Sequence, residues 1–264
     1  MKNMKLFILI LTILSSITSA QNITFIYELN KPNTQTEYYY LDVLGKQSVF
    51  RSESARKADS LALINGYYAS KKPTFEHLYS FKNLISKKIY KSVTHPALYD
   101  LYYINIDENL DWNVHQEKQK IGEFECQKAT TKYGGKTWIA WFDVNNPLQE
   151  GPYIFHGLPG FIVKLTDVDK DFDFNLIRIK RSSKNNQFNI RKGKEINWET
   201  YKKLQEDYYS DPFSAIKAQG YKMKIGDDKG NTLDMSFKDL TGNLQKQLKE
   251  KNSPIELNQK VEFK

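Results

Sequence analysis

Alternating apolar and polar positions dominate the first two thirds of the chain, and they predict β-strands. NITFIYEL (22–29) begins this pattern, and the tyrosine-rich TEYYYLDVLG (36–45) continues it. KPNTQ (31–35) lies between the two segments and is typical of a turn. Aromatic and β-branched residues fit a pleated, half-buried surface, whereas Pro, Asn and Gly favour turns. We therefore expect two strands joined by a turn.

The clearest hairpin is predicted over residues 120–144, KIGEFECQKATTKYGGKTWIAWFDV. Phe124 and Cys126 share one face of its first strand, and every second residue of Trp138–Phe142 shares a face of the second. Gly134-Gly135 supplies the positive φ angles that a tight hairpin turn needs.

Two more strands are predicted in FIVKLTDVDKDFDFNLIRIK (161–180), on either side of the acidic turn DVDKD (167–171). This run resembles a calcium-binding loop. An EF-hand loop that starts at Asp167 requires glycine and glutamate where this chain has Phe172 and Arg178. We therefore interpret the run as a solvated turn.

Apolar positions at three- and four-residue spacing predict three helices. SARKADSLALI (54–64) is a short amphipathic helix. NWETYKKLQEDYY (197–209) opens with an asparagine that is a natural N-cap. SFKDLTGNLQKQLKEK (236–251) opens with a serine and an aspartate that approximate a capping box. Because strands come first and helices late, the chain predicts an α+β, β-rich fold: a curved antiparallel sheet with a few covering helices, mainly C-terminal.

Residues 1–20 have the three parts of a secretory signal peptide. Two lysines precede an apolar run, Leu6–Leu14, that is too short to span a bilayer. Thr18 and Ala20 are the small residues of a cleavage site. We expect the mature chain, 21–264, to be a single domain that is periplasmic or secreted and has no transmembrane anchor.

Charge and cysteine content narrow the possible partners. The net charge is +8, and KRSSKNNQFNIRKGK (180–194) contains six basic residues and no acidic one. This stretch is a nucleic-acid patch, a site of contact with an anionic membrane surface, or a solvated hairpin face. Export and the lack of a nucleic-acid-binding motif favour the solvated face, so no nucleic-acid partner is expected. Cys126 is the single cysteine, so packing alone must hold the fold without an intrachain disulfide.

GPYIFHGLPGFIVKL (151–165) concentrates glycine and proline before an apolar strand. It lacks the G-x-G-x-x-G pattern of a dinucleotide site and the serine of a nucleophile elbow. We therefore interpret it as a structural corner, with Gly157 and Gly160 at positive φ and the prolines fixing φ. The residues assigned to this motif are Gly151, Pro152, Gly157, Leu158, Pro159, Gly160, Phe161 and Ile162.

The same stretch resembles the signature of the GLPGLI family. GLPGFI (157–162) matches it with Phe161 in place of leucine, and similarity extends to DWNVHQEKQKIGEFECQKA (111–129), TWIAWF (137–142) and SPIEL (253–257). The resemblance implies a secreted or periplasmic protein of Bacteroidetes-type bacteria, sometimes encoded near TonB-dependent outer-membrane transport systems. The activity of that family is not established, so the resemblance transfers no catalytic residue.

Candidate chemistry rests on few side chains. Cys126 is a candidate nucleophile with His115 as its partner, although a small buried hydrophobe is the favoured interpretation. The four histidines show no metal-binding spacing, so no metal site and no cofactor is predicted; His156, inside the corner, is the one to inspect. The 17 tyrosines either line a cup for an apolar or glycan ligand or pack the core.

Two function hypotheses follow. The first is a non-enzymatic envelope protein that binds an apolar molecule, a peptide or a partner protein in the concave face of the sheet, with components of a TonB-dependent system among its candidate partners. The second is a hydrolase whose site is assembled in space and leaves no sequence motif.

Overall fold

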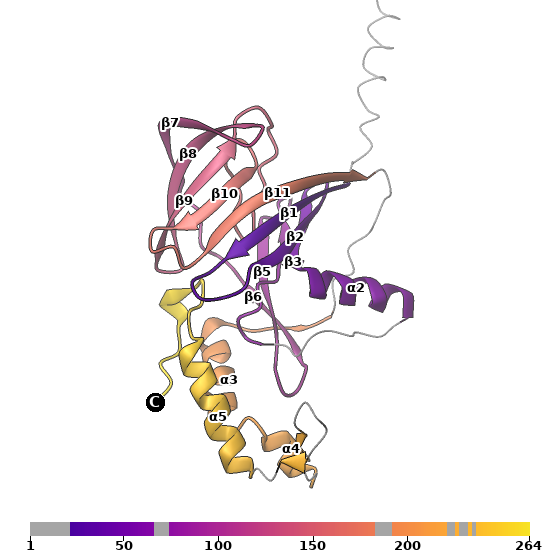
Figure 1. Ribbon diagram of the computed structural model, residues 1–264. Helices are drawn as coiled ribbons and strands as arrows, with labels where there is room; N and C mark the ends of the chain where they lie inside the picture. Colours follow the sequence, from indigo (N-terminus) through magenta and orange to yellow (C-terminus); the bar gives the residue numbers. More distant parts are fainter. Residues whose placement is uncertain (1–21, 66–73, 183–191, 221–224, 227–231, 234–235) are drawn as a thin grey trace, which may run out of the picture.

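One curved β-sheet of 12 strands forms the body of the protein (Figure 1). The computed structural model describes residues 22–65, 74–182, 192–220, 225–226, 232–233 and 236–264, so the predicted signal peptide lies outside the described residues. Across the sheet the order is β12-β6-β5-β4-β3-β2-β1-β11-β10-β9-β8-β7, antiparallel throughout except for β12 beside β6. The strands are β1 (Asn22–Asn30), β2 (Glu37–Leu44), β3 (Gln47–Ser52), β4 (Ser80–Asn83), β5 (Lys88–Thr94), β6 (Leu101–Asn105), β7 (Asn113–Ile121), β8 (Phe124–Tyr133), β9 (Lys136–Asp143), β10 (Ile162–Asp167), β11 (Asp173–Ser182) and β12 (Lys194–Glu195).

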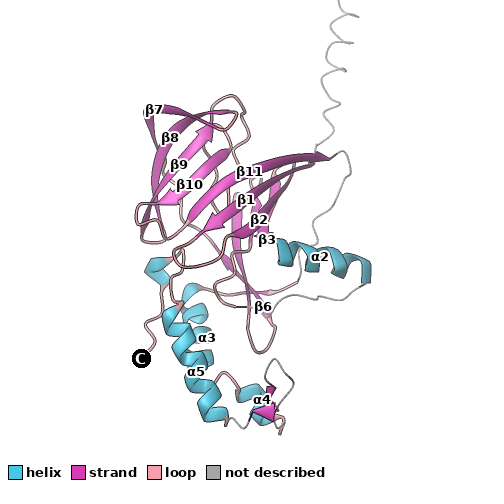
Figure 2. Ribbon diagram, viewed as in Figure 1, coloured by secondary structure: helices cyan, strands magenta, loops and turns pink. Residues whose placement is uncertain are grey.

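The helices lie mainly in the C-terminal part of the chain (Figure 2). α3 (Trp198–Ser210) and α5 (Phe237–Glu250) pack together beyond one end of the sheet, and α2 (Glu53–Asn65) lies beside β2 and β3. The short elements are α4 (Ser214–Ala218), β13 (Ile225–Gly226), β14 (Thr232–Leu233) and the 3-10 helix η1 (Leu257–Gln259). The predicted β-rich α+β class is confirmed, but α3 and α5 cap the end of the sheet instead of covering its face. None of the helices in the described ranges has the length and apolar character needed to cross a membrane.

The predicted helix starts are confirmed by their caps. The Asn197 side chain accepts a hydrogen bond of 2.8 Å from the backbone N–H of Thr200. Ser236 and Asp239 form a complete capping box, in which each side chain bonds the other residue's backbone N–H. These side chains satisfy N–H groups that the first helical turn leaves without partners.

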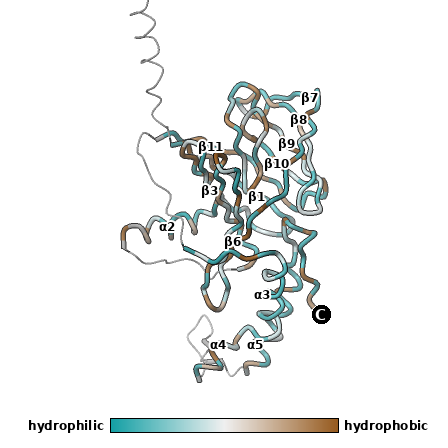
Figure 3. Tube along the Cα trace, turned by 180° about the vertical axis from the view of Figure 1, so that it is seen from behind, coloured by the Kyte–Doolittle hydropathy of each residue, from teal (hydrophilic) through white to brown (hydrophobic). Residues whose placement is uncertain are grey.

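The predicted hairpin is formed by β8 and β9. Gly134 and Gly135 have φ angles of 61° and 80°, the left-handed pair that a two-residue turn requires. Trp138, Ala140 and Phe142 are buried on one face of β9, as their alternation predicts. Figure 3 shows hydrophobic positions concentrated along the sheet, whereas α3 and α5 are mainly hydrophilic.

The acidic turn between β10 and β11 is less solvated than predicted. Asp167 is buried, and its carboxylate accepts hydrogen bonds from the backbone N–H of Phe172 and from Lys136 Nζ at 2.9 Å. Asp171 binds the same ammonium group. The run therefore neutralises a buried lysine, because a charge taken out of water needs a paired counter-charge.

Residues 144–161, between β9 and β10, fill the inside of the curved sheet. The ring centroid of Tyr153 lies 6.4 Å from that of Phe50 on β3, and that of Phe155 lies 4.7 Å from that of Trp138 on β9. Since β3 and β9 are far apart in the strand order, a segment that contacts both must lie on the concave side. The expectation that the concave face is open for a ligand is therefore wrong where this segment packs.

Candidate functional site

The GLPG corner is held by close backbone packing. Gly157 has the expected positive φ, 91°, but Gly160 does not, so the positive-φ prediction for Gly160 is wrong. A Cβ atom on Gly160 would lie 1.8 Å from the carbonyl oxygen of Asp143. The Asp143 N–H donates to the Phe161 carbonyl at 3.0 Å, which draws the two chains together at this point. Gly160 is therefore required by contact, whereas Gly157 is required by conformation.

A buried ion pair anchors the segment that leads into the corner. Lys82 of β4 lies 2.8 Å from the Glu150 carboxylate and also donates to the carbonyl oxygens of Gly151 and Phe155. Burial lowers the pKa of Lys82, and Glu150 opposes that shift. Ser80 of the same strand donates to the Tyr153 carbonyl. Side chains of β4 thus bind the backbone of residues 151–155 and fix its position. Side-chain packing alone would let this segment slide along the sheet.

The C-terminal segment supplies a second anchor. The Glu256 carboxylate accepts hydrogen bonds from Lys91 at 2.7 Å, Tyr133 at 2.9 Å and Tyr153 at 2.7 Å. Burial alone would raise the pKa of Glu256, but Lys91 and the two phenols hold it below its ordinary value. Burial would likewise lower the pKa of Lys91, and Glu256 raises it instead. The Glu256 carboxylate thereby joins β5, β8 and the interior segment, residues 144–161.

The residues singled out for chemistry are not brought together. His115 Nε2 lies 2.8 Å from Thr130 Oγ1, while Cys126 pairs across the sheet with Gln119. Burial, followed by the charge of Asp143, raises the pKa of the Cys126 thiol to about 11, so the thiolate that a nucleophile needs is scarce at neutral pH. A buried small hydrophobe is what the surroundings of Cys126 support.

His156 also has local partners. Its Nδ1 lies 3.0 Å from the Ile154 carbonyl oxygen, and its own carbonyl accepts a hydrogen bond of 2.8 Å from the Trp112 indole. Burial lowers the pKa of His156, with Lys82 acting in the same direction. Among the described residues, no three His, Cys, Asp or Glu side chains are grouped as metal ligands.

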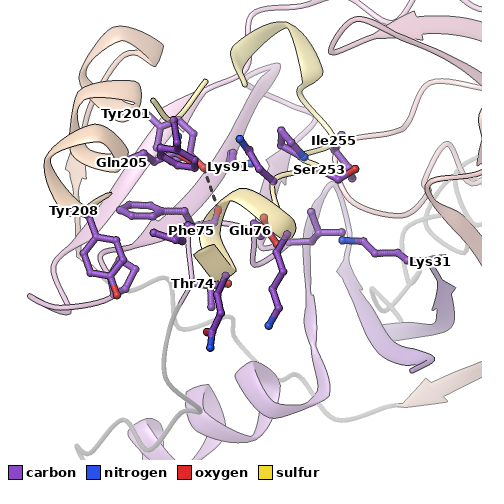
Figure 4. A pocket seen from close by; sticks show the side chains of 18 of the residues that line it. Lys31, Thr74, Phe75, Glu76, Lys91, Tyr201, Gln205, Tyr208, Ser253 and Ile255 are labelled. Carbon is purple, nitrogen blue, oxygen red and sulfur yellow. Dashed lines mark hydrogen bonds between the residues drawn. The ribbon is translucent and has the colours of Figure 1, made fainter. Parts of the chain in front are cut away.

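A cleft of about 200 Å³ lies between α3, α5, the C-terminal segment and the residues that precede β4. Figure 4 shows Phe75 beside Tyr201 and Tyr208 of α3, and the Tyr201 hydroxyl donates to the Phe75 carbonyl at 3.0 Å. Aromatic and aliphatic side chains form most of its lining, chiefly Phe75, Leu78, Phe172, Tyr201, Tyr208, Leu244, Leu248 and Phe263. A mainly apolar lining of this kind is typical of a ligand site.

Two half-buried charged side chains give the cleft a polar side. Burial lowers the pKa of Lys31, and the charge of Glu76 opposes the shift. Burial raises the pKa of Glu76, and Lys31 opposes that shift in turn. Lys31 Nζ also lies 4.6 Å from the centroid of the Phe172 ring, within the range of a cation–π contact. Partly desolvated charges of opposite sign beside an apolar surface suit a ligand that has both characters.

Sequence reasoning did not find these side chains. Lys82, Glu150, Lys31 and Glu76 look like ordinary surface charges in the sequence, because their partners lie in distant segments. Glu256 carried a signal, since it stands inside the SPIEL segment that supports the family resemblance. Tyr201 and Tyr208 line the cleft and are also buried in the core cluster, together with Tyr27, Tyr39, Tyr133 and Tyr153.

Comparison with known proteins identifies the fold but no family. No family model matches this chain, and a search of curated proteins finds no match to its sequence. Solved structures of PNGF-II in the C2 and P21 space groups match with TM-scores of 0.53 and 0.50 at 16% and 14% identity. Each match covers 70% of this chain, and the chain spans 32% and 33% of the length of PNGF-II in the two crystals. An uncharacterized conserved protein from Thermus thermophilus gives a TM-score of 0.37 at 8% identity, covering 71% of this chain and 96% of that one. At these identities the likeness to PNGF-II shows a shared fold and nothing of the chemistry.

Proposed function

We propose that this chain is a non-enzymatic binding protein of the bacterial cell envelope, and that its ligand occupies the cleft beside α3 and α5. The observation that supports this proposal is the combination of an apolar lining with the half-buried pair Lys31 and Glu76. Clefts that bind ligands are typically apolar, with a few polar groups that fix orientation.

The size of the cleft limits what enters it. Its volume, about 200 Å³, is smaller than the ~300–1,000 Å³ that pockets for whole drug-sized ligands occupy. We therefore propose that the cleft takes the apolar end of an amphiphilic ligand, with a polar part that meets Lys31 and Glu76.

Location and family are further parts of this proposal. The signal-like N-terminus supports export to the periplasm or beyond, and the GLPGFI and SPIEL segments support membership of the GLPGLI family. Trp112, Tyr153 and Glu256, which stand in or beside the segments that resemble that family, share one hydrogen-bonded region. Components of a TonB-dependent system are candidate partners on the same grounds.

Displacement of the fluorescent apolar probe N-phenyl-1-naphthylamine by amphiphiles tests the proposal. Leu244→Arg places a charge in the cleft, so we expect at least a tenfold loss of probe affinity, about 1.4 kcal/mol. Leu61→Arg is the matched control, because Leu61 lies on α2 away from the cleft and its side chain is already 41% exposed. Equal affinity in wild type and Leu244→Arg would contradict the proposal. Ester hydrolysis by the wild type that Glu76→Gln abolishes would support the hydrolase hypothesis instead.

A further inference from the structure

β11 has a complete partner on one side only. β1 pairs with it along its length, from Asn22 opposite Ser182 to Asn30 opposite Asp173. β10 pairs only with residues 173–175. Figure 1 shows β11 extending past β10 as the two strands diverge. Among the described residues, the side of β11 that faces β10 therefore has no strand partner from Leu176 to Ser182.

The divergence begins at the corner before β10. β10 has a bulge at Val163, where its register against β9 shifts. Immediately before the bulge, the Phe161 ring turns into the core, with its centroid 5.1 Å from that of Phe25 and 5.4 Å from that of Phe124. The Ile162 N–H donates to the Glu150 carbonyl at 2.9 Å, so the backbone before β10 pairs with the preceding loop instead of continuing beside β11. The GLPG corner thus creates an unpaired sheet edge within the body of the protein.

A hollow of about 300 Å³ lies where the missing strand would run. Most of its lining is apolar and comes from the adjoining ends of β7 and β8, from β10 and from β11: Ile121, Phe124, Val163, Leu176, Ile177 and Ile179. Ile177 stands at a bulge in β11 and its side chain is 48% exposed. Unpaired backbone groups beside exposed apolar side chains are the features of an edge that accepts another strand.

The charge around this edge is positive. Arg178, Lys180 and Arg181 follow one another along the unpaired half of β11 and are exposed. Glu123 is the acidic residue that lines the hollow among the described residues. Positive side chains on an edge repel a basic strand and attract an acidic one.

We propose that the unpaired half of β11 binds an extended segment of a partner protein in which apolar residues alternate with Asp or Glu. The segment adds to the sheet as a strand and bonds to the backbone of residues 176–182. Because neighbouring side chains of a strand point to opposite faces, its apolar residues enter the hollow while its acidic residues meet Arg178 and Lys180. This site is separate from the cleft beside α3 and α5 and does not depend on the function proposed for that cleft.

Two measurements on the full chain test the proposal. The probe is a fluorescein-labelled ten-residue peptide of alternating valine and glutamate, and a valine–lysine peptide of the same length is its counterpart. In fluorescence anisotropy we expect the acidic peptide to bind and the basic one not to bind. In amide hydrogen exchange we expect the amides of residues 176–182 that point away from β1 to exchange rapidly in the free protein and to be protected by the acidic peptide, while the exposed edge strand β7 is unaffected.

Charge-reversal variants distinguish peptide binding at β11 from peptide binding at the edge strand β7. The double variant Arg178→Glu, Lys180→Glu should bind the acidic peptide at least tenfold more weakly than the wild type and bind the basic peptide more tightly. Lys118→Glu with Lys120→Glu on β7 is the matched control and should leave both affinities unchanged. Ile177→Asp tests whether the hollow takes part in peptide binding. Because Ile177 is exposed, this substitution leaves the core intact.

Several outcomes would overturn the proposal. Absence of acidic-peptide binding at about 1 mM, the limit of weak association, is one of them. An equal loss of affinity in the β7 variant is another. Protection, in the free protein, of those amides of residues 176–182 that point away from β1 would also contradict it. Protection independent of protein concentration would mean that the chain itself covers the edge, and protection that grows with concentration would mean that a second copy does.

Discussion

Gly157 and Gly160 stand three residues apart in the corner, yet different forces restrict them. Gly157 has a φ of 91° with open space around the position of a Cβ atom, so substitution there meets backbone strain alone. At Gly160 a Cβ atom would lie 1.8 Å from the Asp143 carbonyl oxygen, so substitution there forces two backbone segments apart. Backbone yields less readily than a side chain, because its movement breaks the pairing on either side.

The two glycines therefore predict an ordered pair of effects. Gly157→Ala should cost about 1–2 kcal/mol of unfolding free energy, the penalty for an L-residue in the left-handed region. Gly160→Ala should cost more than that and lower the melting temperature further, because Asp143 must also move. Urea unfolding followed by tryptophan fluorescence measures both. If Gly160→Ala proves as stable as the wild type, the close approach at Asp143 does not govern the corner.

At the scale of elements, the C-terminal segment connects strands that are distant in the sheet. Glu256 reaches Lys91 of β5 and Tyr133 of β8, and both its partners and its own carboxylate are buried. A carboxylate with a cation and two hydroxyl donors is well satisfied, but removal of its charge leaves the Lys91 ammonium buried without a counter-ion.

Glu256→Gln should accordingly destabilise the protein by about 3–5 kcal/mol at pH 7. Glu262→Gln is the control, since Glu262 is exposed and lies 3.4 Å from Lys260. The pKa of Glu256 is lowered in the folded protein, so its stabilisation is present above the unfolded value of about 4.3 and is lost as pH falls through the folded value. The difference between wild type and Glu256→Gln should therefore be constant near pH 6–7 and shrink below about pH 4. A difference that does not change with pH would exclude the Glu256 carboxylate as its source.

The sequence predicts features that depend on neighbouring residues, but not those that depend on contacts between distant segments. The Gly134-Gly135 turn and the Asn197 and Ser236 caps depend on neighbours within a few residues, so the sequence alone indicates them. The interior position of residues 144–161 depends on contacts with β3, β4 and β9, which no local period encodes. The cleft likewise joins segments near residues 31, 75, 205 and 250 that are separated by most of the chain.

The whole molecule is organised around that interior segment. Lys82 of β4, in one half of the sheet, donates a hydrogen bond to its backbone, and Trp138 of β9, in the other half, packs against its Phe155 ring. In an open sheet, strands far apart in the order share no backbone hydrogen bonds, so a segment that contacts both halves links their stabilities, as Glu256 does between β5 and β8.

This arrangement predicts that the sheet unfolds as one cooperative unit. In native-state hydrogen exchange at increasing urea, the slowest amides of β2–β4 and of β8–β9 should give the same opening free energy, since neither half keeps its core when the segment leaves. Lys82→Met leaves Glu150 buried without a counter-charge, so it should lower both values together by about 3–5 kcal/mol. Lys128→Met removes an exposed ion pair with Glu117 and should change them by no more than about 0.5 kcal/mol. If Lys82→Met lowers the value for β2–β4 and leaves β8–β9 at the wild-type level, the halves are independent, and the interior segment belongs to one of them rather than joining the two.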